Sequence, residues 1–360
     1  MKAILVLESG RSFVGETNSR ISTKVGRVNF DTRVVGYQEA ITDTANAGRI
    51  LVLTYPLIGN YGVAAKFNES DRVWPCALII KEKSVIFSNW QAQESLDRWA
   101  KRHRLPIIYG IDTRTLAVHL RQRGEMMGAV SGSVFDPKRL LRHIKQNKGN
   151  VIHRNWLKKT SVREVKYLGK RSGPRVVVID LGISRNILKE LENLELNIAL
   201  VPFDTKAEDI LKLKPKVLII SNGPEESSGL SAAASTVKEL LGKIPILGIS
   251  TGAQVLAQSL GAGVKRMHIG HHGLNYPLKS PGSLKGNITV QNHSYVIDTK
   301  SLNKHKDIEV TAYNLNDNSI EEFESRKLKI LGVQYYPLSP GLEEVHPVFD
   351  RTIRPWLRQS

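Results

Sequence analysis

The sequence predicts an α/β protein, with an N-terminal mainly β domain followed by a doubly wound parallel-sheet domain. Short apolar runs with turn signals dominate the first half of the 360 residues, whereas the second half alternates β-branched runs with helical segments. Repeated strand–helix units require a parallel sheet covered on both faces. Between the halves, a basic stretch ends in the turn signal Arg171-Ser172-Gly173-Pro174. We therefore divide the chain into an N-terminal domain, a linker and a second domain: residues 1–150, 151–173 and 174–360.

The first half carries the signals of buried strands and of two helices. Residues 3–8 are predicted to form a strand followed by a turn at Ser9-Gly10, and residues 49–54 form a continuous apolar run suited to a buried strand. Helical periodicity appears at 95–103 and again at 114–123. These elements predict a domain built mainly from strands.

Four strand–helix units follow one another in the second half. The predicted strands are 176–180, 198–202, 217–221 and 244–249, and the helices that follow them are 185–194, 207–213, 231–241 and 254–260. Ligands of such sheets bind at the carboxyl ends of the strands. We therefore expect the site to be formed by Ser221-Asn222-Gly223-Pro224 and Ser250-Thr251-Gly252.

The composition is that of an ordinary folded protein, with 41% hydrophobic and 24% charged residues. No apolar run is long enough to span a membrane, and Glu8 comes too early for a secretory signal, so we expect a cytoplasmic protein without membrane contact. The single cysteine, Cys76, excludes an intramolecular disulfide and a multi-thiolate zinc site. It lies in an apolar run, which indicates an inert thiol.

The net charge is strongly positive, at +18 from 52 basic and 34 acidic residues. The basic residues are scattered, with denser clusters at 101–104 and 166–175, and the sequence has neither zinc-finger spacing nor an aromatic RNA-binding signature. We therefore expect no nucleic-acid partner, and favour an acidic protein partner or simple solvation.

A Gly-x-Ser-x-Gly turn follows the fourth strand of the second half, at Gly248-Ile249-Ser250-Thr251-Gly252. Flanking glycines permit a sharp turn that presents the central side chain at a helix N-terminus, where backbone N–H groups can hold an oxyanion. Small residues also allow simple close packing. The motif alone therefore leaves two interpretations open, a turn that presents a nucleophile and a turn that only packs closely.

Several further segments have the form of family motifs. They are Gly36-Tyr37-Gln38-Glu39, 53–60, Gly110-Ile111-Asp112-Thr113-Arg114, Ser221-Asn222-Gly223-Pro224, Gly270-His271-His272-Gly273 and Gln291-Asn292-His293. With these motifs, residues 174–360 resemble a class I glutamine amidotransferase domain, and the whole chain resembles the small subunit of carbamoyl phosphate synthetases. The N-terminal matches discriminate this family from other triad amidotransferases.

The resemblance implies a division of labour between two subunits. The small subunit hydrolyses glutamine and passes ammonia to a large ATP-using subunit, which makes carbamoyl phosphate for pyrimidine and arginine synthesis. This chain has no Gly-x-x-x-x-Gly-Lys-Ser/Thr phosphate loop. We therefore expect no cofactor on this chain, and place ATP, Mg and bicarbonate on the large subunit, its expected partner.

The family's catalytic triad is replaced at all three positions. The resemblance places Ser250 at the position of the nucleophilic cysteine, Tyr336 at that of the general-base histidine and Leu338 at that of the orienting glutamate. A serine hydroxyl needs a base, and a phenol accepts a proton only as the anion of an acid with a pKa of about 10. We expect glutaminase activity to be absent or very weak, and the change of Ser250 alone to cysteine not to restore it.

The glutamine-binding positions are altered as well. Ala45 stands where the family has a serine, and Glu225 replaces the last residue of a Gly-Pro-Gly turn, where its carboxylate is expected to repel a substrate carboxylate. The positions that the resemblance assigns to glutamine binding are Ala45, Gly223, Glu225, Thr251, Gln254, Asn292, Ser294 and Tyr295.

Three hypotheses remain open. The favoured one is a small subunit without glutaminase activity that serves as a scaffold or activator of an ammonia-using synthetase. The second is residual glutaminase or serine hydrolase activity through Ser250, and the third is a non-catalytic regulatory or binding protein. The second hypothesis needs a base or acid from another position, for which the candidates are His271, His272, His293, Asp298, Asp317 and His346. No metal site is indicated, because the pair His271-His272 lacks an acidic or thiol ligand at useful spacing.

Overall fold

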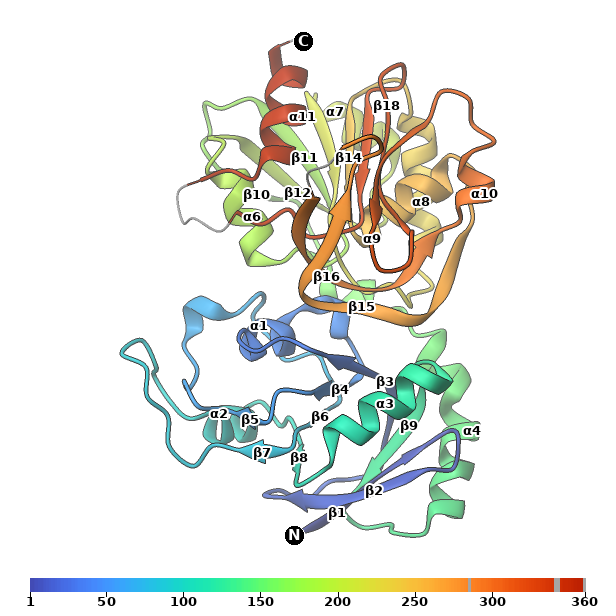
Figure 1. Ribbon diagram of the computed structural model, residues 1–360. Coiled ribbons are helices and arrows are strands. Elements are labelled where there is room, and N and C mark those ends of the chain that lie inside the picture. Colours follow the sequence, from blue (N-terminus) through green and yellow to red (C-terminus); the bar gives the residue numbers. More distant parts are fainter. Residues whose placement is uncertain (284–285, 340–343, 359–360) are drawn as a thin grey trace. The chain divides into compact units, whose positions relative to one another are not determined.

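The computed structural model describes residues 1–283, 286–339 and 344–358 (Figure 1). The chain forms two compact units, one of residues 1–154 with 268–272, and one of residues 155–267 with 273–360. The N-terminal unit is mainly β and the C-terminal unit contains a parallel sheet with helices, so the α/β prediction is confirmed. None of the helices in the described ranges is long and apolar enough to cross a membrane.

The N-terminal unit is built on a closed barrel. Its strands follow the order β1-β2-β8-β6-β4-β3-β9, and β1 pairs with β9 to close it. The apolar run at 49–54 forms strand β4, and all four of its residues are buried. The strands of this unit are β1 (Lys2–Leu7), β2 (Ser12–Thr17), β3 (Lys24–Asp31), β4 (Ile50–Leu53), β6 (Ala77–Ile79), β8 (Ile107–Tyr109) and β9 (Met126–Ser131), with a separate pair β5 (Leu57–Ile58) and β7 (Glu82–Lys83).

Helices pack against the strands of this barrel. Alternate side chains of β1 belong to two apolar clusters, as the period of two in a strand requires. One cluster includes side chains of α3, and the other includes Leu140 and Ile144 of α4. The helices are α1 (Tyr37–Thr42), α2 (Leu96–Arg102), α3 (Thr113–Arg123) and α4 (Pro137–Ile152), with 3-10 turns at Thr44–Asn46 and Ala65–Phe67.

The C-terminal unit contains a ten-stranded sheet of order β10-β12-β11-β13-β14-β19-β18-β17-β15-β16. The five neighbouring strands β12, β11, β13, β14 and β19 are parallel. Antiparallel strands extend the sheet at both edges, β10 beside β12 and β18 beside β19. The strands are β10 (Lys166–Gly169), β11 (Arg175–Asp180), β12 (Asn197–Pro202), β13 (Val217–Ile220), β14 (Ile246–Ile249), β15 (Val264–Lys279), β16 (Gly286–Ile297), β17 (Glu309–Asn314), β18 (Ile320–Ser325) and β19 (Ile330–Val333).

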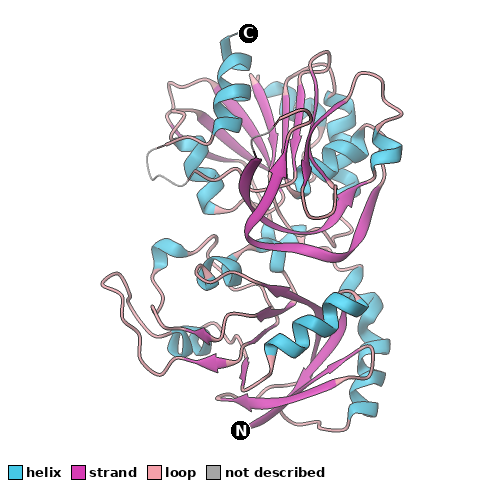
Figure 2. Cartoon of the chain, in the orientation of Figure 1, coloured by secondary structure: helices cyan, strands magenta, loops and turns pink. Residues whose placement is uncertain are grey.

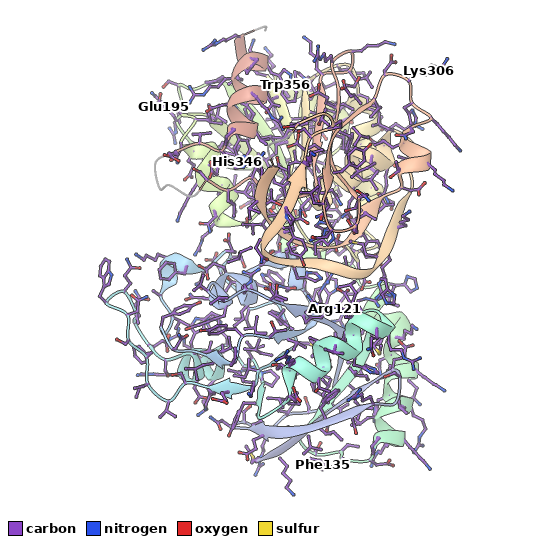
Figure 3. The ribbon with its side chains drawn as sticks, in the orientation of Figure 1. Arg121, Phe135, Glu195, Lys306, His346 and Trp356 are labelled. Carbon is purple, nitrogen blue, oxygen red and sulfur yellow. The ribbon has the colours of Figure 1, made fainter. Side chains whose placement is uncertain are left out.

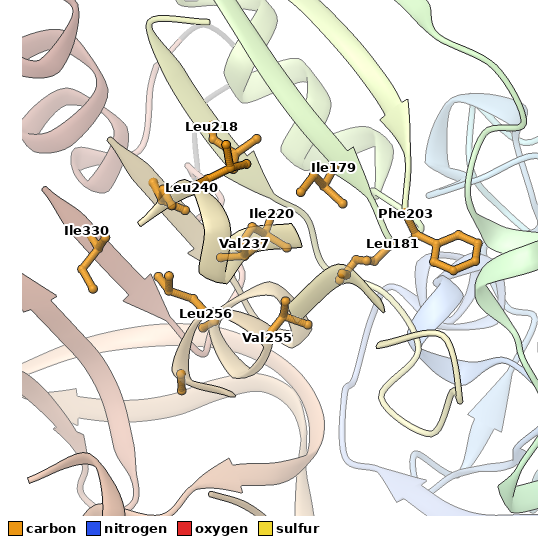
Figure 4. Close-up of a cluster of buried hydrophobic side chains, with 14 of the residues drawn as sticks. Ile179, Leu181, Phe203, Leu218, Ile220, Val237, Leu240, Val255, Leu256 and Ile330 are labelled. Carbon is orange, nitrogen blue, oxygen red and sulfur yellow. The ribbon is translucent and has the colours of Figure 1, made fainter. Parts of the chain in front are cut away.

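Helices cover both faces of this sheet (Figure 2). Val177 and Ile179 of β11 belong to the cluster that holds α7, α8 and α9, part of which is drawn in Figure 4. Val176 and Val178 belong to the opposite cluster, which holds α6 and α11. The helices are α5 (Leu157–Thr160), α6 (Arg185–Glu192), α7 (Ala207–Lys212), α8 (Leu230–Leu240), α9 (Thr251–Ser259), α10 (Thr299–Leu302) and α11 (Pro347–Arg358).

The segment expected to be a linker differs from that expectation. Residues 151–173 contain the end of α4, helix α5 and strand β10, and the boundary between the units falls after residue 154. Strand β10 pairs with β12 at the edge of the sheet and is largely exposed, so its sequence shows no apolar alternation. The basic composition reflects this exposed edge.

The excess of basic side chains extends over the surface of both units. Arg121 of α3 and Lys306 are exposed, as are several acidic side chains such as Glu195 (Figure 3). The few exposed ion pairs among them contribute little to stability because water and salt screen them.

Candidate functional site

Strands β13, β14 and β19 bring three loops to one edge of the C-terminal sheet. In the parallel register, Gly248 of β14 lies opposite Ile220 of β13 and Gly332 of β19. The carboxyl ends of the three strands are therefore adjacent. The segments that begin there are the loop 221–225, the turn at Ser250 with the first residues of α9, and residues 334–338, as the strand-end rule predicts.

Ser250 occupies a sharp turn between β14 and α9. Its backbone has φ 53° and ψ −113°, a conformation that costs a residue with a side chain about 1–3 kcal/mol. The N–H of Ser250 donates to the carbonyl of Val333 at 2.7 Å, and its carbonyl accepts from the N–H groups of Ala253 and Gln254. The turn is thus fixed between β19 and the first turn of α9.

The glycines on either side of Ser250 are required by close backbone packing. A Cβ atom on Gly248 would lie 2.6 Å from the carbonyl oxygen of Gly252, and one on Gly252 would overlap the carbonyl oxygen of Ile220. Either contact would force the turn apart. The Gly-x-Ser-x-Gly motif therefore encodes a nucleophile-type elbow, and close packing is part of how that elbow is held.

Thr251 and Gly223 join the elbow to the loop after β13. The hydroxyl of Thr251 donates to the carbonyl of Gly223 at 2.6 Å, and Thr251 is fully buried. A Cβ atom on Gly223 would lie 2.5 Å from the carbonyl oxygen of Leu181, so this position also requires glycine. Both residues thus hold the backbone around the site.

Glu225 is bound within the site. Its Oε2 accepts the backbone N–H of Ser294 at 2.6 Å, while its Oε1 accepts the N–H of Tyr295 at 3.1 Å and the Nε2–H of Gln254 at 2.7 Å. Glu225 is 7% exposed. We expected its carboxylate to repel a substrate carboxylate; in the structure, protein donors hold it in place.

The segment after β19 holds Tyr336 and Leu338. Tyr336 is 5% exposed, and its N–H donates to the carbonyl of Val290 at 2.9 Å, which anchors the segment to β16. Leu338 is half-buried and packs against the apolar cluster that includes α6 and α11. Its side chain has no atom that could accept a proton or orient a base.

Gln334 is a member of the site that sequence reasoning did not select. Its side-chain amide donates to the carbonyl of Tyr295 at 3.1 Å, and the amide of Gln254 donates to the same carbonyl at 3.2 Å. Gln334 is the first residue after β19, so the strand-end rule could have found it. Asn292, Ser294 and Tyr295 lie on β16 beside these groups.

The histidine candidates for a substitute base have other contacts. His293 is fully buried; its Nδ1 donates to the carbonyl of Tyr295 at 3.0 Å, and its Nε2 lies 3.1 Å from Oε1 of Gln291. His272 belongs to the N-terminal unit, where its Nε2 lies 2.9 Å from Glu125. Burial alone would raise the pKa of Glu125, but the hydrogen bond from His272 and the interaction with its charge hold the pKa of Glu125 well below the usual range. These contacts favour structural roles. His271 also belongs to the N-terminal unit.

The remaining candidates are held locally. Asp298 caps α10 by accepting the N–H of Ser301, and Asp317 accepts the N–H of Ser319 in a turn. His346 accepts the N–H of Val348 just before α11, and burial, with Arg351 nearby, lowers the pKa of its ring to about 4. Ala45 lies in the N-terminal unit, buried in the turn Thr44–Asn46 with its N–H donated to Asp43.

The chain matches known families in both halves. Residues 5–130 match the model of the carbamoyl-phosphate synthase small chain, CPSase domain, and residues 177–354 match that of glutamine amidotransferase class-I. Over 354 residues, the chain is 36% identical to the carbamoyl phosphate synthase pyrimidine-specific small chain of Bacillus subtilis, with 98% of this chain and 95% of the relative covered. The carbamoyl phosphate synthase small chains of Aquifex aeolicus and Archaeoglobus fulgidus are 36% and 35% identical, with 98% of each chain covered.

Proposed function

The chain belongs to the family of carbamoyl phosphate synthase small chains, and from this premise we propose that it supports carbamoyl phosphate formation without hydrolysing glutamine itself. Its partner is a large ATP-using subunit, which supplies the sites for ATP, Mg and bicarbonate. In this role the chain is a scaffold or activator of a synthetase that uses free ammonia, in the cytoplasm, for pyrimidine or arginine synthesis.

The proposal is supported by the residues at the three positions that the resemblance assigns to the triad, on a backbone that keeps the elbow. Ser250 stands in a strained elbow, but the neighbouring segment offers the phenol of Tyr336 and the apolar side chain of Leu338. In a triad hydrolase, loss of nucleophile and base lowers the rate by about a million-fold, equivalent to about 8 kcal/mol of barrier. Close packing of Gly248 and Gly252 explains why the elbow persists without its chemistry.

The direct test is carbamoyl phosphate formation by this chain with its cognate large subunit. Glutamine and ammonium are supplied in parallel as the nitrogen donor, and the large subunit alone serves as the control. We expect activity with ammonium, increased by this chain, and none above background with glutamine. Glutamine-driven synthesis would contradict the proposal, and the absence of any effect of this chain would favour a regulatory protein outside the synthetase.

A second function is favoured by the elbow alone. A serine hydrolase of another specificity would use Ser250 at the strained turn and take its base from elsewhere. A fluorophosphonate probe separates the two functions, because it labels only an activated serine. Labelling that disappears in Ser250→Ala would support the hydrolase, and unlabelled protein would leave the scaffold function in place.

A further inference from the structure

The carboxylate of Glu225 accepts hydrogen bonds from three N–H groups that lie on two separate segments. Ser294 and Tyr295 donate from consecutive residues of β16, and Gln254 donates from its side chain on α9. Ser294 donates to Oε2, and Tyr295 and Gln254 both donate to Oε1. This is a two-point contact of the kind that holds a carboxylate in a fixed orientation.

Burial makes these donors energetically important. Glu225 is 7% exposed, so its carboxylate has lost most of its water, and burying the charge is tolerated only when protein groups replace the lost hydrogen bonds. All three donors are neutral amides, which recognise a carboxylate without requiring a neighbouring cation. The same three N–H groups would donate hydrogen bonds to the carboxylate of any small molecule that reached them.

The donors are held in position by contacts other than those to Glu225. The carbonyl of Tyr295 accepts from Gln254, from Gln334 and from Nδ1 of His293. These bonds orient the peptide unit that follows Tyr295 and anchor the segment that carries the two backbone donors. The arrangement is a cradle, formed by the N–H groups of Ser294, Tyr295 and Gln254, that does not need Glu225 for its shape.

The cradle borders the elbow. The backbone N–H of Gln254 donates to the carbonyl of Ser250 at 3.2 Å, and Glu225 lies two residues after Gly223, whose carbonyl accepts the hydroxyl of Thr251. A carboxylate-bearing molecule seated in the cradle would therefore lie beside Ser250. Glutamine carries such a carboxylate on its α-carbon.

We propose that Glu225 is an internal ligand: its carboxylate occupies a carboxylate-binding cradle beside Ser250 and excludes the carboxylates of free amino acids. Removal of this side chain opens the cradle to an α-amino acid such as glutamine or to a simple carboxylate such as acetate. The inference rests on the proposed function in one respect, since it takes the site beside the elbow to be a former glutamine site. It adds that binding, and not only chemistry, is blocked.

The test compares Glu225→Gly with the unmodified chain in thermal unfolding and in equilibrium dialysis with labelled L-glutamine. We expect the variant to have a Tm lower by about 5 °C, and about 0.2 M sodium acetate to recover part of this loss where equal sodium chloride does not. We also expect the variant to retain at least about tenfold more glutamine than the unmodified chain at the same free concentration.

Two variants serve as matched controls. Glu226→Ala removes the neighbouring carboxylate, which accepts the hydroxyl of Tyr295 at 3.0 Å, and we expect no specific response to acetate or glutamine. Glu225→Gln keeps the side chain in the cradle but removes its charge, so its Tm should fall without recovery by acetate. Recovery of Glu225→Gln to the same extent as Glu225→Gly would contradict occupation of the cradle.

The inference is overturned if folded Glu225→Gly responds to no carboxylate, or if the unmodified chain retains glutamine equally well. If Glu225→Gly does not fold, its refolding yield in acetate is compared with that in chloride: an acetate-dependent yield supports the cradle, and equal yields contradict it. These readouts report binding. Glutamine-driven synthesis by the unmodified chain would refute the proposed function, whereas an unresponsive variant with ammonium-only synthesis would refute the cradle alone.

Discussion

The carboxyl ends of β14 and β19 are neighbouring parts of one sheet edge, but they differ in backbone strain and in the side chains that follow them. After β14, the elbow at Ser250 keeps its strained backbone and the two glycines that this backbone requires. After β19, Tyr336 and Leu338 stand where the resemblance places a base and its orienting carboxylate, and Leu338 packs with apolar side chains. The comparison teaches that backbone packing can hold the geometry of an elbow whether or not the neighbouring segment supplies a base.

The prediction with the largest expected effect asks whether the residues that follow β19 limit glutamine hydrolysis. Ser250→Cys alone should keep glutaminase activity within about tenfold of the unmodified chain, because no base uses the thiol. Adding Tyr336→His, Leu338→Glu and Glu225→Gly should raise the activity by about a thousandfold over Ser250→Cys, the usual contribution of a positioned base. Ammonia release from glutamine measures both.

The matched control for this series carries Tyr336→Phe in place of Tyr336→His, with the other three changes kept. It should show no gain, since phenylalanine cannot accept a proton. Appreciable turnover by Ser250→Cys alone, or an equal gain in the phenylalanine control, would show that the residues at the β19 end do not limit glutamine hydrolysis.

A smaller effect tests whether packing holds the β14 end. Gly252→Ala puts a Cβ atom into the carbonyl oxygen of Ile220, and we expect the free energy of unfolding to fall by about 3 kcal/mol. Urea unfolding followed by circular dichroism measures the change. Gly149→Ala is the control, because no atom lies within 4 Å of the new Cβ in helix α4, and it should be neutral or stabilising by up to about 1 kcal/mol. Equal stabilities would remove the packing explanation of the elbow.

The smallest effect concerns pH and the β19 side of the edge. The ring of His346 lies 6.0 Å from that of Tyr335, and Arg351 and Glu322 are the charged groups that act on it. Its pKa falls from 6.5 to about 4 on folding, because burial and Arg351 outweigh Glu322. The folded state thus binds the proton less well, so this contribution is complete above pH 6.5 and is lost as the pH falls toward 4.

We expect His346→Gln to reduce the loss of stability between pH 6.5 and pH 4 by about 1 kcal/mol, a value lowered for the partial exposure of the ring. Urea unfolding at several pH values, with His305→Gln as the control for a histidine in another loop, measures this slope. An unchanged slope would show that the protonation of His346 is not coupled to folding.

Much of the C-terminal fold could be predicted from local patterns. The apolar runs at 176–180 and 217–221 became β11 and β13, and the helical periodicity at 231–241 became α8. The long strands β15 and β16 were not predicted, and neither was helix α4, which follows the last periodic segment of the first half. Closure of the barrel depends on pairing between β1 and β9, residues that are far apart in the chain, and local periodicity carries no information on such pairs.

The sequence by itself determined the family resemblance, the position of the elbow and the residues at the three positions that the resemblance assigns to a triad, because these depend on residue types at fixed spacing. Tertiary structure alone decided the state of Glu225, whose hydrogen-bond partners Ser294 and Tyr295 are 69 and 70 residues away. The sequence indicates a negative charge at position 225, and the fold supplies the donors that bind it. A buried carboxylate acts on its surroundings through its partners, and these are set by the packing of β16 against α9.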